Sequence, residues 1–334
     1  MKIIVDAMGG DHAPMEILKG CLDAVKEYEI ELTLIGKEDV IQQHLSSLNA
    51  PLEVFAIVNA SETIEPDEPP VIAIKRKKDS SMVKGFEMLR QHPGSVFISA
   101  GSTGALMAGG LLKVGRIKGI NRPALAPLIP TKEKPILLID AGANAECKPE
   151  NLVQFAIMGT VYMEKVLGRA NPTVGLVNIG AEEGKGNELT KATYSLLKEQ
   201  SNINFYGNVE ARDIPAGIVD IIVCDGFTGN VILKLTEGLA SSLFGLMKEQ
   251  FTKGFVSKIG ALLLKPSLKG LKDSLDYAEH GGAPLLGVNG GIIKAHGSSD
   301  ARAIKNAIRQ GKRFIDMQVL ENIKSNIVED TKEV

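Results

Sequence analysis

Five apolar, β-branched runs along the chain each end abruptly in a turn of small and polar residues. The runs and their turns lie at 3–11, 96–105, 136–144, 175–187 and 220–230. In an open α/β sheet, ligands bind beyond the carboxyl ends of the strands, where glycine turns and helix N-termini present N–H groups. The pattern therefore predicts that most of the chemistry of this protein lies along one edge of a sheet.

Segments with helical spacing of apolar residues follow these runs, so the chain alternates between strand and helix patterns. Helices are predicted at 15–28, 83–91, 151–167 and 188–198, and further strands at 32–35, 52–58 and 203–206. Such alternation implies parallel strands joined by right-handed crossovers. We interpret residues 1–334 as one α/β domain, and the segment rich in Pro and basic residues at 117–134 leaves open a cleft between two lobes.

An acidic, proline-rich loop at 62–70 interrupts this alternation and is followed by a cluster of basic residues, Lys75, Arg76, Lys77 and Lys78. The default interpretation of the cluster is a solvated helix face. Its place directly before Asp79 and two serines also suits an acidic ligand or partner.

A second interruption is the lysine-rich, apolar segment at 251–271. On a helical wheel its apolar residues share one face that lysines border, as snorkelling side chains do: Phe251, Phe255, Ile259, Leu262, Lys258 and Lys265. Gly254 and Gly260 weaken a helix here, and Pro266 ends it. The segment therefore predicts a protruding hairpin of two short helices at about 250–273.

Composition fits a globular enzyme in a reducing compartment. The 334-residue chain has a formal net charge of −2, so nucleic acid is not an evident partner. Its three cysteines form no CxxC or metal-binding spacing. The chain enters a strand pattern without a secretory leader, and no apolar run approaches the roughly 18 residues that span a bilayer, which predicts a cytoplasmic location.

None of the glycine turns matches a sharp nucleotide-binding signature. GAEEGK at 180–185 is one residue short of a P-loop, and Gly186 stands where Ser or Thr would hold magnesium. No strand is followed by GxGxxG. A metal site from acids near strand ends is disfavoured because such acids more often cap helices: Asp6, Asp11, Asp140 and Asp225. Small-anion chemistry remains the best interpretation of the turns.

The densest polar constellation is DGFTGN at 225–230, directly before a predicted helix. An acid, a hydroxyl, an amide and two glycines suit phosphate binding and oxyanion stabilisation. We favour this over a helix merely capped by Asp225 or Thr228, because a cap needs only one such residue. Cys224 follows a buried run and precedes an acid, so an inert core thiol is predicted.

Three other features of the sequence lead to less specific structural predictions. His12 suits anion binding and a structural role about equally. GGAPLLGVNGG at 281–291 is interpreted as a surface loop. Ser298 and Ser299 are candidate N-caps of a last amphipathic helix.

A series of motifs, in this order, resembles the phosphate acyltransferase (PlsX) family of bacterial phospholipid synthesis. They are DAMGGDHAP at the start, KKDSSM (77–82), SAGSTGA (99–105), DAGAN (140–144), NIGAEEGKGN (178–187), GNVEARDI (207–214), VCDGFTGNV (223–231) and GVNG (287–290). The resemblance runs nearly end to end. One departure is Ser102, which stands where the family motif SAGNTGA has Asn.

The resemblance implies an enzyme that transfers a long-chain acyl group from acyl carrier protein to inorganic phosphate, giving acyl phosphate for phospholipid synthesis. It implies a three-layer αβα, Rossmann-like, mostly parallel fold of the isopropylmalate dehydrogenase and phosphotransacetylase type, usually as a homodimer. Neither a cofactor nor a metal is expected.

Phosphate attack on a thioester needs a site that holds a dianion and stabilises a tetrahedral oxyanion. Phosphate is itself nucleophilic near neutral pH, so no covalent Ser or Cys intermediate is required. The hypothesis assigns phosphate binding to Ser102, Thr103, Gly104, Asn144, His12, Gly226 and Gly229. Thr228 and Asn230 are expected to contact the thioester carbonyl, and Asp225 to orient donors or to act as base and acid. Lys185 and Arg122 are candidates for further positive charge.

The same resemblance implies functions for the basic cluster at 75–78 and the apolar segment at 251–271. The cluster at 75–78 would steer the acidic carrier protein, and the 251–271 hairpin would lie on an anionic membrane surface. The contact residues would then be Lys75, Arg76, Lys77, Lys78, Phe255, Lys258, Leu262, Leu263 and Lys265. A dimer contact and a lid over the acyl chain are alternatives for the apolar face. The expected location is cytoplasmic, with peripheral association to the membrane.

Two rival functions remain open. A phosphotransacylase acting on short-chain coenzyme A thioesters would use the same phosphate loops. A non-catalytic scaffold of lipid synthesis would use only the hairpin and the basic cluster. A dehydrogenase of the same fold is disfavoured, because neither a nicotinamide nor a metal signature is present.

Overall fold

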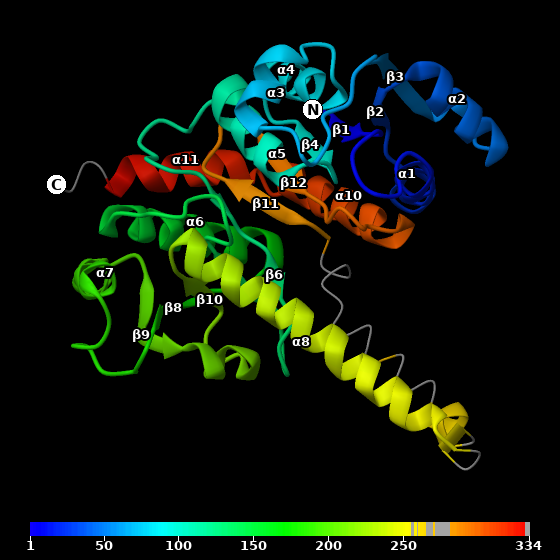
Figure 1. Ribbon diagram of the computed structural model, residues 1–334. Coiled ribbons are helices and arrows are strands. Elements are labelled where there is room, and N and C mark those ends of the chain that lie inside the picture. Colours follow the sequence, from blue (N-terminus) through cyan, green and yellow to red (C-terminus); the bar gives the residue numbers. More distant parts are fainter. Residues whose placement is uncertain (255–256, 259, 265–269, 271–280, 331–334) are drawn as a thin grey trace.

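The computed structural model describes residues 1–254, 257–258, 260–264, 270 and 281–330. Its strands form two sheets (Figure 1). The seven-stranded sheet has the order β3-β2-β1-β4-β12-β11-β5. Its strands are β1 (Ile3–Asp6), β2 (Leu32–Gly36), β3 (Phe55–Asn59), β4 (Val96–Ser99), β5 (Ala124–Leu125), β11 (Ala283–Leu286) and β12 (Gly291–Lys294).

The second sheet has five strands in the order β6-β7-β10-β8-β9. They are β6 (Leu128–Ile129), β7 (Ile136–Ile139), β8 (Thr173–Asn178), β9 (Asn204–Glu210) and β10 (Ile221–Val223). Most pairs in both sheets are parallel, and the short β5, β6 and β11 pair antiparallel. The expectation of one edge is therefore wrong, because the five polar loops divide between two sheets.

Helices cover both faces of the sheets. They are α1 (Met15–Tyr28), α2 (Glu38–Ser47), α3 (Pro70–Arg76), α4 (Ser81–Gln91), α5 (Thr103–Gly109), α6 (Pro149–Leu167), α7 (Glu188–Glu199), α8 (Gly226–Thr252), α10 (Ala301–Asp316) and α11 (Val319–Asp330). Short turns of 3-10 helix lie at Leu52–Val54 and Ala211–Ala216, and a π-helical turn at Gly110–Val114. One core cluster of buried residues runs from the first sheet through α10 and α6 into the second, so the two sheets share a continuous core.

The segment at 117–134, where the sequence left open a cleft between two lobes, joins the two sheets. It contributes β5 to the seven-stranded sheet and β6 to the five-stranded sheet, and only Ala126 and Pro127 separate the two strands. The carboxyl ends of strands from both sheets consequently approach one another near this crossing.

Two expectations near the C-terminus are wrong. Residues 281–291 do not form a surface loop, because Leu285 and Leu286 lie on β11, which pairs with β12, and both are buried. The last amphipathic helices begin after Asp300, whose carboxylate accepts a hydrogen bond from Ala303 N at 2.9 Å. The nearby serines do not cap α10, because the chain makes a turn at 296–299 before the helix starts.

Helix α8 is the longest described helix, at 27 residues, and it projects away from both sheets (Figure 1). It runs through the start of the predicted hairpin and ends at Thr252, and described helical residues follow at 257–258 and 260–264. Phe255 and Lys265, two of the predicted contact residues, lie outside the described residues. No helix among the described residues is both long and apolar enough to cross a bilayer.

Candidate active site

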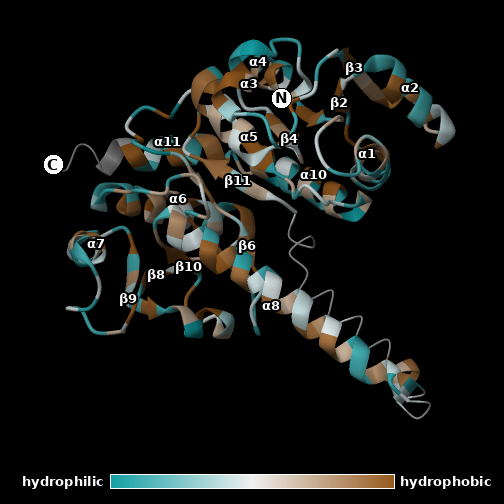
Figure 2. Cartoon of the chain, in the orientation of Figure 1, coloured by the Kyte–Doolittle hydropathy of each residue, from teal (hydrophilic) through white to brown (hydrophobic). Residues whose placement is uncertain are grey.

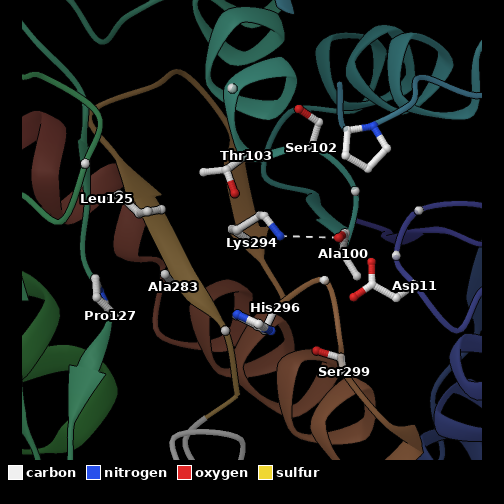
Figure 3. Close-up of a pocket in the computed structure, with 18 of the residues that line it drawn as sticks. Asp11, Ala100, Ser102, Thr103, Leu125, Pro127, Ala283, Lys294, His296 and Ser299 are labelled. Carbon is white, nitrogen blue, oxygen red and sulfur yellow. Dashed lines mark hydrogen bonds between the residues drawn. The ribbon is translucent and has the colours of Figure 1, made fainter. Parts of the chain in front are cut away.

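Loops from both sheets line a cavity of about 780 Å³. The loops after β1, β4, β7 and β12 contribute, together with one face of α8 and the loop at 63–66. Polar and charged residues from three of these elements converge on it in Figure 3: Asp11, Thr103, Lys294 and His296. This cavity is the candidate active site.

The loop after β4 supplies three of the predicted phosphate-binding residues, Ser102, Thr103 and Gly104, to the cavity wall. Ser102 is the N-cap of α5, and its Oγ accepts a hydrogen bond from Ala105 N at 3.4 Å. The backbone N–H groups of Ser102, Thr103 and Gly104 donate no hydrogen bond to any residue that the structure describes. These donors are therefore available to an anion in the cavity.

Asp140 organises the loop after β7. Its carboxylate accepts hydrogen bonds from Leu125 N, Gly142 N, Ala143 N and Asn144 N at 2.7–3.2 Å. Burial raises the pKa of Asp140 above its usual value, and these hydrogen bonds oppose the shift. Asn144 donates from Nδ2 to Pro123 O at 2.7 Å and to Asp140 Oδ2 at 2.9 Å. Asn144, predicted to bind phosphate, thus holds the loop together and does not line the cavity.

The DGFTGN segment was expected directly before a helix, but Asp225 is the N-cap and residues 226–230 are the first helical residues of α8. Asp225 accepts hydrogen bonds from Thr228 N at 2.9 Å and Thr228 Oγ1 at 2.8 Å. The capping role considered as the alternative therefore describes Asp225, whereas Thr228 lies in the first helical turn and donates to the cap. Only Asn230 of this segment lines the cavity.

The two glycines of the same segment serve packing, which corrects their assignment to phosphate. A Cβ on Gly226 would lie 2.6 Å from Asn144 O, and one on Gly229 would lie 1.8 Å from Asp140 O. Both positions must lack a side chain because the first turn of α8 rests on the loop after β7.

Lys185, His12 and Arg122 are not brought to the cavity wall. Lys185 lies in the loop after β8, where its carbonyl oxygen accepts a hydrogen bond from Asn178 Nδ2 at 3.0 Å. His12 is exposed beside Asp11.

The prediction for Cys224 is confirmed: the thiol is buried, and burial raises its pKa well above the usual value.

Sequence reasoning missed the charged residues Asp11, Lys294 and His296 as cavity residues. Lys294 ends β12, is only 8% exposed, and lines the cavity. Burial lowers the pKa of Lys294 to about 8, and Asp11 and Asp6 oppose this shift. The sequence did contain a signal for Lys294, because in GIIKAHG a charged residue ends an apolar run, as Asp6 does at the end of β1.

The carboxylates considered for a metal site do not gather. Asp6 accepts a hydrogen bond from Ser99 Oγ at 2.7 Å, Asp140 holds its own loop and Asp225 caps α8. In the part of the chain that the structure describes, no three His, Cys, Asp or Glu side chains are grouped to hold a metal ion.

Comparison with known proteins identifies the family. The family model described as "Fatty acid synthesis protein" matches residues 1–322. A phosphate acyltransferase from Alkaliphilus oremlandii is 58% identical over 327 residues, which cover 98% of this chain and 97% of the relative. One from Clostridium tetani is 53% identical over 329 residues, 98% of each chain. The chain belongs to the phosphate acyltransferase family.

As a phosphate acyltransferase family member, this protein is an acyltransferase enzyme. Its fold is also that of a solved EutD phosphotransacetylase from Staphylococcus aureus, with a TM-score of 0.60 and 14% sequence identity over 96% of this chain and 94% of the other. The predicted α/β fold of the phosphotransacetylase type is thereby confirmed.

Proposed function

We propose that this member of the phosphate acyltransferase family transfers a long-chain acyl group from acyl carrier protein to inorganic phosphate and releases acyl phosphate for phospholipid synthesis. One observation carries the proposal: a single cavity has both a glycine-rich polar wall and an apolar wall. The polar wall consists of the loops after β1 and β4, and the apolar wall includes Ile64, Leu125, Pro127, Leu128 and Leu233. Such a cavity suits an anion beside an acyl group.

The residues suit direct attack of phosphate on the thioester carbonyl. Unused N–H groups of Ser102, Thr103 and Gly104 would hold the phosphate oxygens. Asn230, on the facing helix, would donate its side-chain amide to the carbonyl oxygen, where negative charge develops as the tetrahedral intermediate forms. Asp225 and Thr228 would act indirectly by fixing the first turn of α8.

The deciding experiment incubates the purified protein with palmitoyl carrier protein and labelled phosphate. The expected product is labelled palmitoyl phosphate, which hydroxylamine converts to a hydroxamate. Phosphate-dependent loss of acetyl coenzyme A without reaction of the carrier protein substrate would instead identify a short-chain phosphotransacylase. If phosphate causes no loss of any thioester, the result would favour the non-catalytic scaffold of lipid synthesis.

The surface of α3 is proposed to receive the acidic carrier protein. Lys77 is already paired, since its Nζ donates to Glu68 Oε1 at 2.5 Å and to Thr63 O at 2.7 Å. Lys75, Arg76 and Lys78 are exposed and form no ion pair with a residue that the structure describes. This basic surface lies close to the site, because α3 packs on α5.

Charge reversal tests the carrier-protein surface. The double variant Lys75→Glu and Arg76→Glu is expected to raise KM for acyl carrier protein and to leave KM for phosphate unchanged, because opposite charges steer protein association. Lys191→Glu on α7, also exposed, is the matched control. Equal effects of both variants would remove α3 from the proposal.

Helix α8 is proposed to form a homodimer contact, and the described residues that follow it are proposed to form a peripheral membrane contact. Exposed apolar residues recur every three or four positions along α8, visible as repeated brown patches in Figure 2: Phe227, Val231, Leu235, Leu239, Leu243 and Leu246. This spacing makes one apolar stripe, which a second copy of the chain would cover. Leu262, Leu263 and Leu264 are exposed farther along the chain, as is Lys258, and this combination suits an anionic lipid surface.

Two measurements separate these contacts. Leu239→Glu is expected to convert a dimer to a monomer in analytical ultracentrifugation. Leu263→Glu, at a residue 77% exposed, is expected to abolish flotation with vesicles rich in anionic lipid, whereas Ile179→Glu, at a residue 81% exposed elsewhere, leaves flotation intact. Undiminished flotation of Leu263→Glu would discard the membrane contact.

A further inference from the structure

Lys294 occupies an unusual position for a lysine. It is the last residue of β12, and β12 pairs in parallel with β4 so that Lys294 lies opposite Ser99. The register places its side chain beside the loop at 100–104, whose sequence AGSTG carries no charge. The residue is 8% exposed, yet it lines the cavity.

The contacts of Lys294 leave part of its ammonium group unused. Nζ donates to Ala100 O at 3.3 Å, the dashed line in Figure 3, and to Ala295 O. An ammonium group has three N–H donors, so one remains. Lys294 forms no ion pair with a residue that the structure describes. A buried cation held only by carbonyl oxygens is unfavourable unless an anion joins it.

We propose that Lys294 binds the phosphate substrate directly and supplies the positive charge that the 100–104 loop lacks. The inference rests on the proposed function, because that function identifies the anion as inorganic phosphate. Backbone N–H groups of the loop orient the phosphate oxygens, and the ammonium group offsets their charge.

The surrounding charges make such a cation necessary. Asp11 lines the same cavity, and its carboxylate repels a phosphate dianion. Asp6 lies behind the loop and accepts a hydrogen bond from Ser99 Oγ. Lys234 is the other lysine on the described cavity wall, but it is exposed on α8, where water screens its charge. Lys294 is therefore the better desolvated partner for the anion.

A purely structural role is the competing explanation, since Nζ also links Ala100 to the end of β12. The test must therefore separate phosphate binding from folding. Incorporation of ¹³C-labelled lysine gives side-chain NMR signals while the ammonium groups stay unmodified, and Lys294→Met identifies the signal of this residue. We expect inorganic phosphate to shift the Lys294 signal in the wild-type protein, and sulfate or chloride at equal ionic strength to shift it less.

Kinetics provide the second readout. Lys294→Met is expected to raise KM for phosphate about tenfold or more, as loss of one charge-assisted hydrogen bond would, and to leave KM for the acyl donor nearly unchanged. Lys294→Arg, which keeps the charge, is expected to recover most of the phosphate affinity, and Lys191→Met is the matched surface control.

Two outcomes would overturn the inference. One is a Lys294 signal in the wild-type protein that does not respond to phosphate. The other is a folded Lys294→Met variant with an unchanged KM for phosphate. If the Lys294 signal responds to phosphate but no acyl phosphate is formed from any thioester, the proposed function fails and the phosphate site stands.

Discussion

Gly229 packs so closely against Asp140 that a Cβ atom on Gly229 would lie 1.8 Å from the Asp140 carbonyl oxygen. This contact seats the first turn of α8 on the loop after β7. Because Asn230 is the next residue, the same contact delivers its side chain to the cavity. Gly229, which does not line the cavity, thus sets the position of Asn230, which is proposed to contact the substrate.

Gly229→Ala is therefore expected to destabilise the protein by about 1–3 kcal/mol or more, because the added methyl group overpacks a buried contact. Gly238→Ala on the same helix is the matched control, since a Cβ there meets no atom within 4 Å. That control should be neutral or stabilising by roughly 0.5–1 kcal/mol, because alanine favours a helix interior. Urea unfolding of both variants measures the difference, and equal stabilities would contradict the packing argument.

Replacement of Asp225 distinguishes a cap from an acid–base catalyst. Asp225→Asn keeps a capping oxygen and is expected to reduce turnover by less than about tenfold, whereas a general acid–base group contributes about 10²–10⁴-fold. Asp225→Ala removes the cap and is expected to cost about 1 kcal/mol of stability. Steady-state rates and unfolding curves of the two variants decide between the roles, and a collapse of turnover in a stable Asp225→Asn variant would favour catalysis.

Asn230→Ala is expected to lower turnover by about 10²–10³-fold if the amide stabilises the oxyanion. Stability should change little, because the Asn230 side chain makes no hydrogen bond with a residue that the structure describes. Ser241→Ala, at an exposed site on the same helix, is the control for changes in α8 itself. Undiminished turnover of a folded Asn230→Ala variant would remove Asn230 from the mechanism.

Phosphate affinity is expected to fall as the pH rises above about 8. Burial lowers the pKa of Lys294 from 10.5 to about 8, so above this pH the residue loses the positive charge that would bind phosphate. Asp11 and Asp6 are the other titratable groups that act on Lys294. KM for phosphate, measured from about pH 7 to about pH 9.5, should rise in the wild type and stay flatter in Lys294→Arg, since a guanidinium keeps its charge. Identical profiles would contradict the assignment.

Much of the fold could be predicted from local pattern. The strands β1, β4, β7 and β10 and the helix α1 lie where apolar spacing placed them, because period and burial are local properties of the chain. The pairing of β11 with β12 could not be predicted in this way. Its glycine-rich sequence is typical of a loop, and the strand order that buries it arises only when β12 inserts between β4 and β11.

The candidate site could likewise be predicted only in part from the sequence. The sequence by itself determined that polar residues follow buried strands, that Ser102, Thr103 and Asn230 come shortly after the ends of such strands, and that Cys224 is an inert core thiol. Tertiary structure decided which turns share a cavity, which polar residues serve only as caps or loop braces, and that Lys294 is desolvated beside an uncharged loop. The physical reason is that capping and strand formation depend on neighbours in sequence, whereas desolvation and convergence depend on how two sheets pack together.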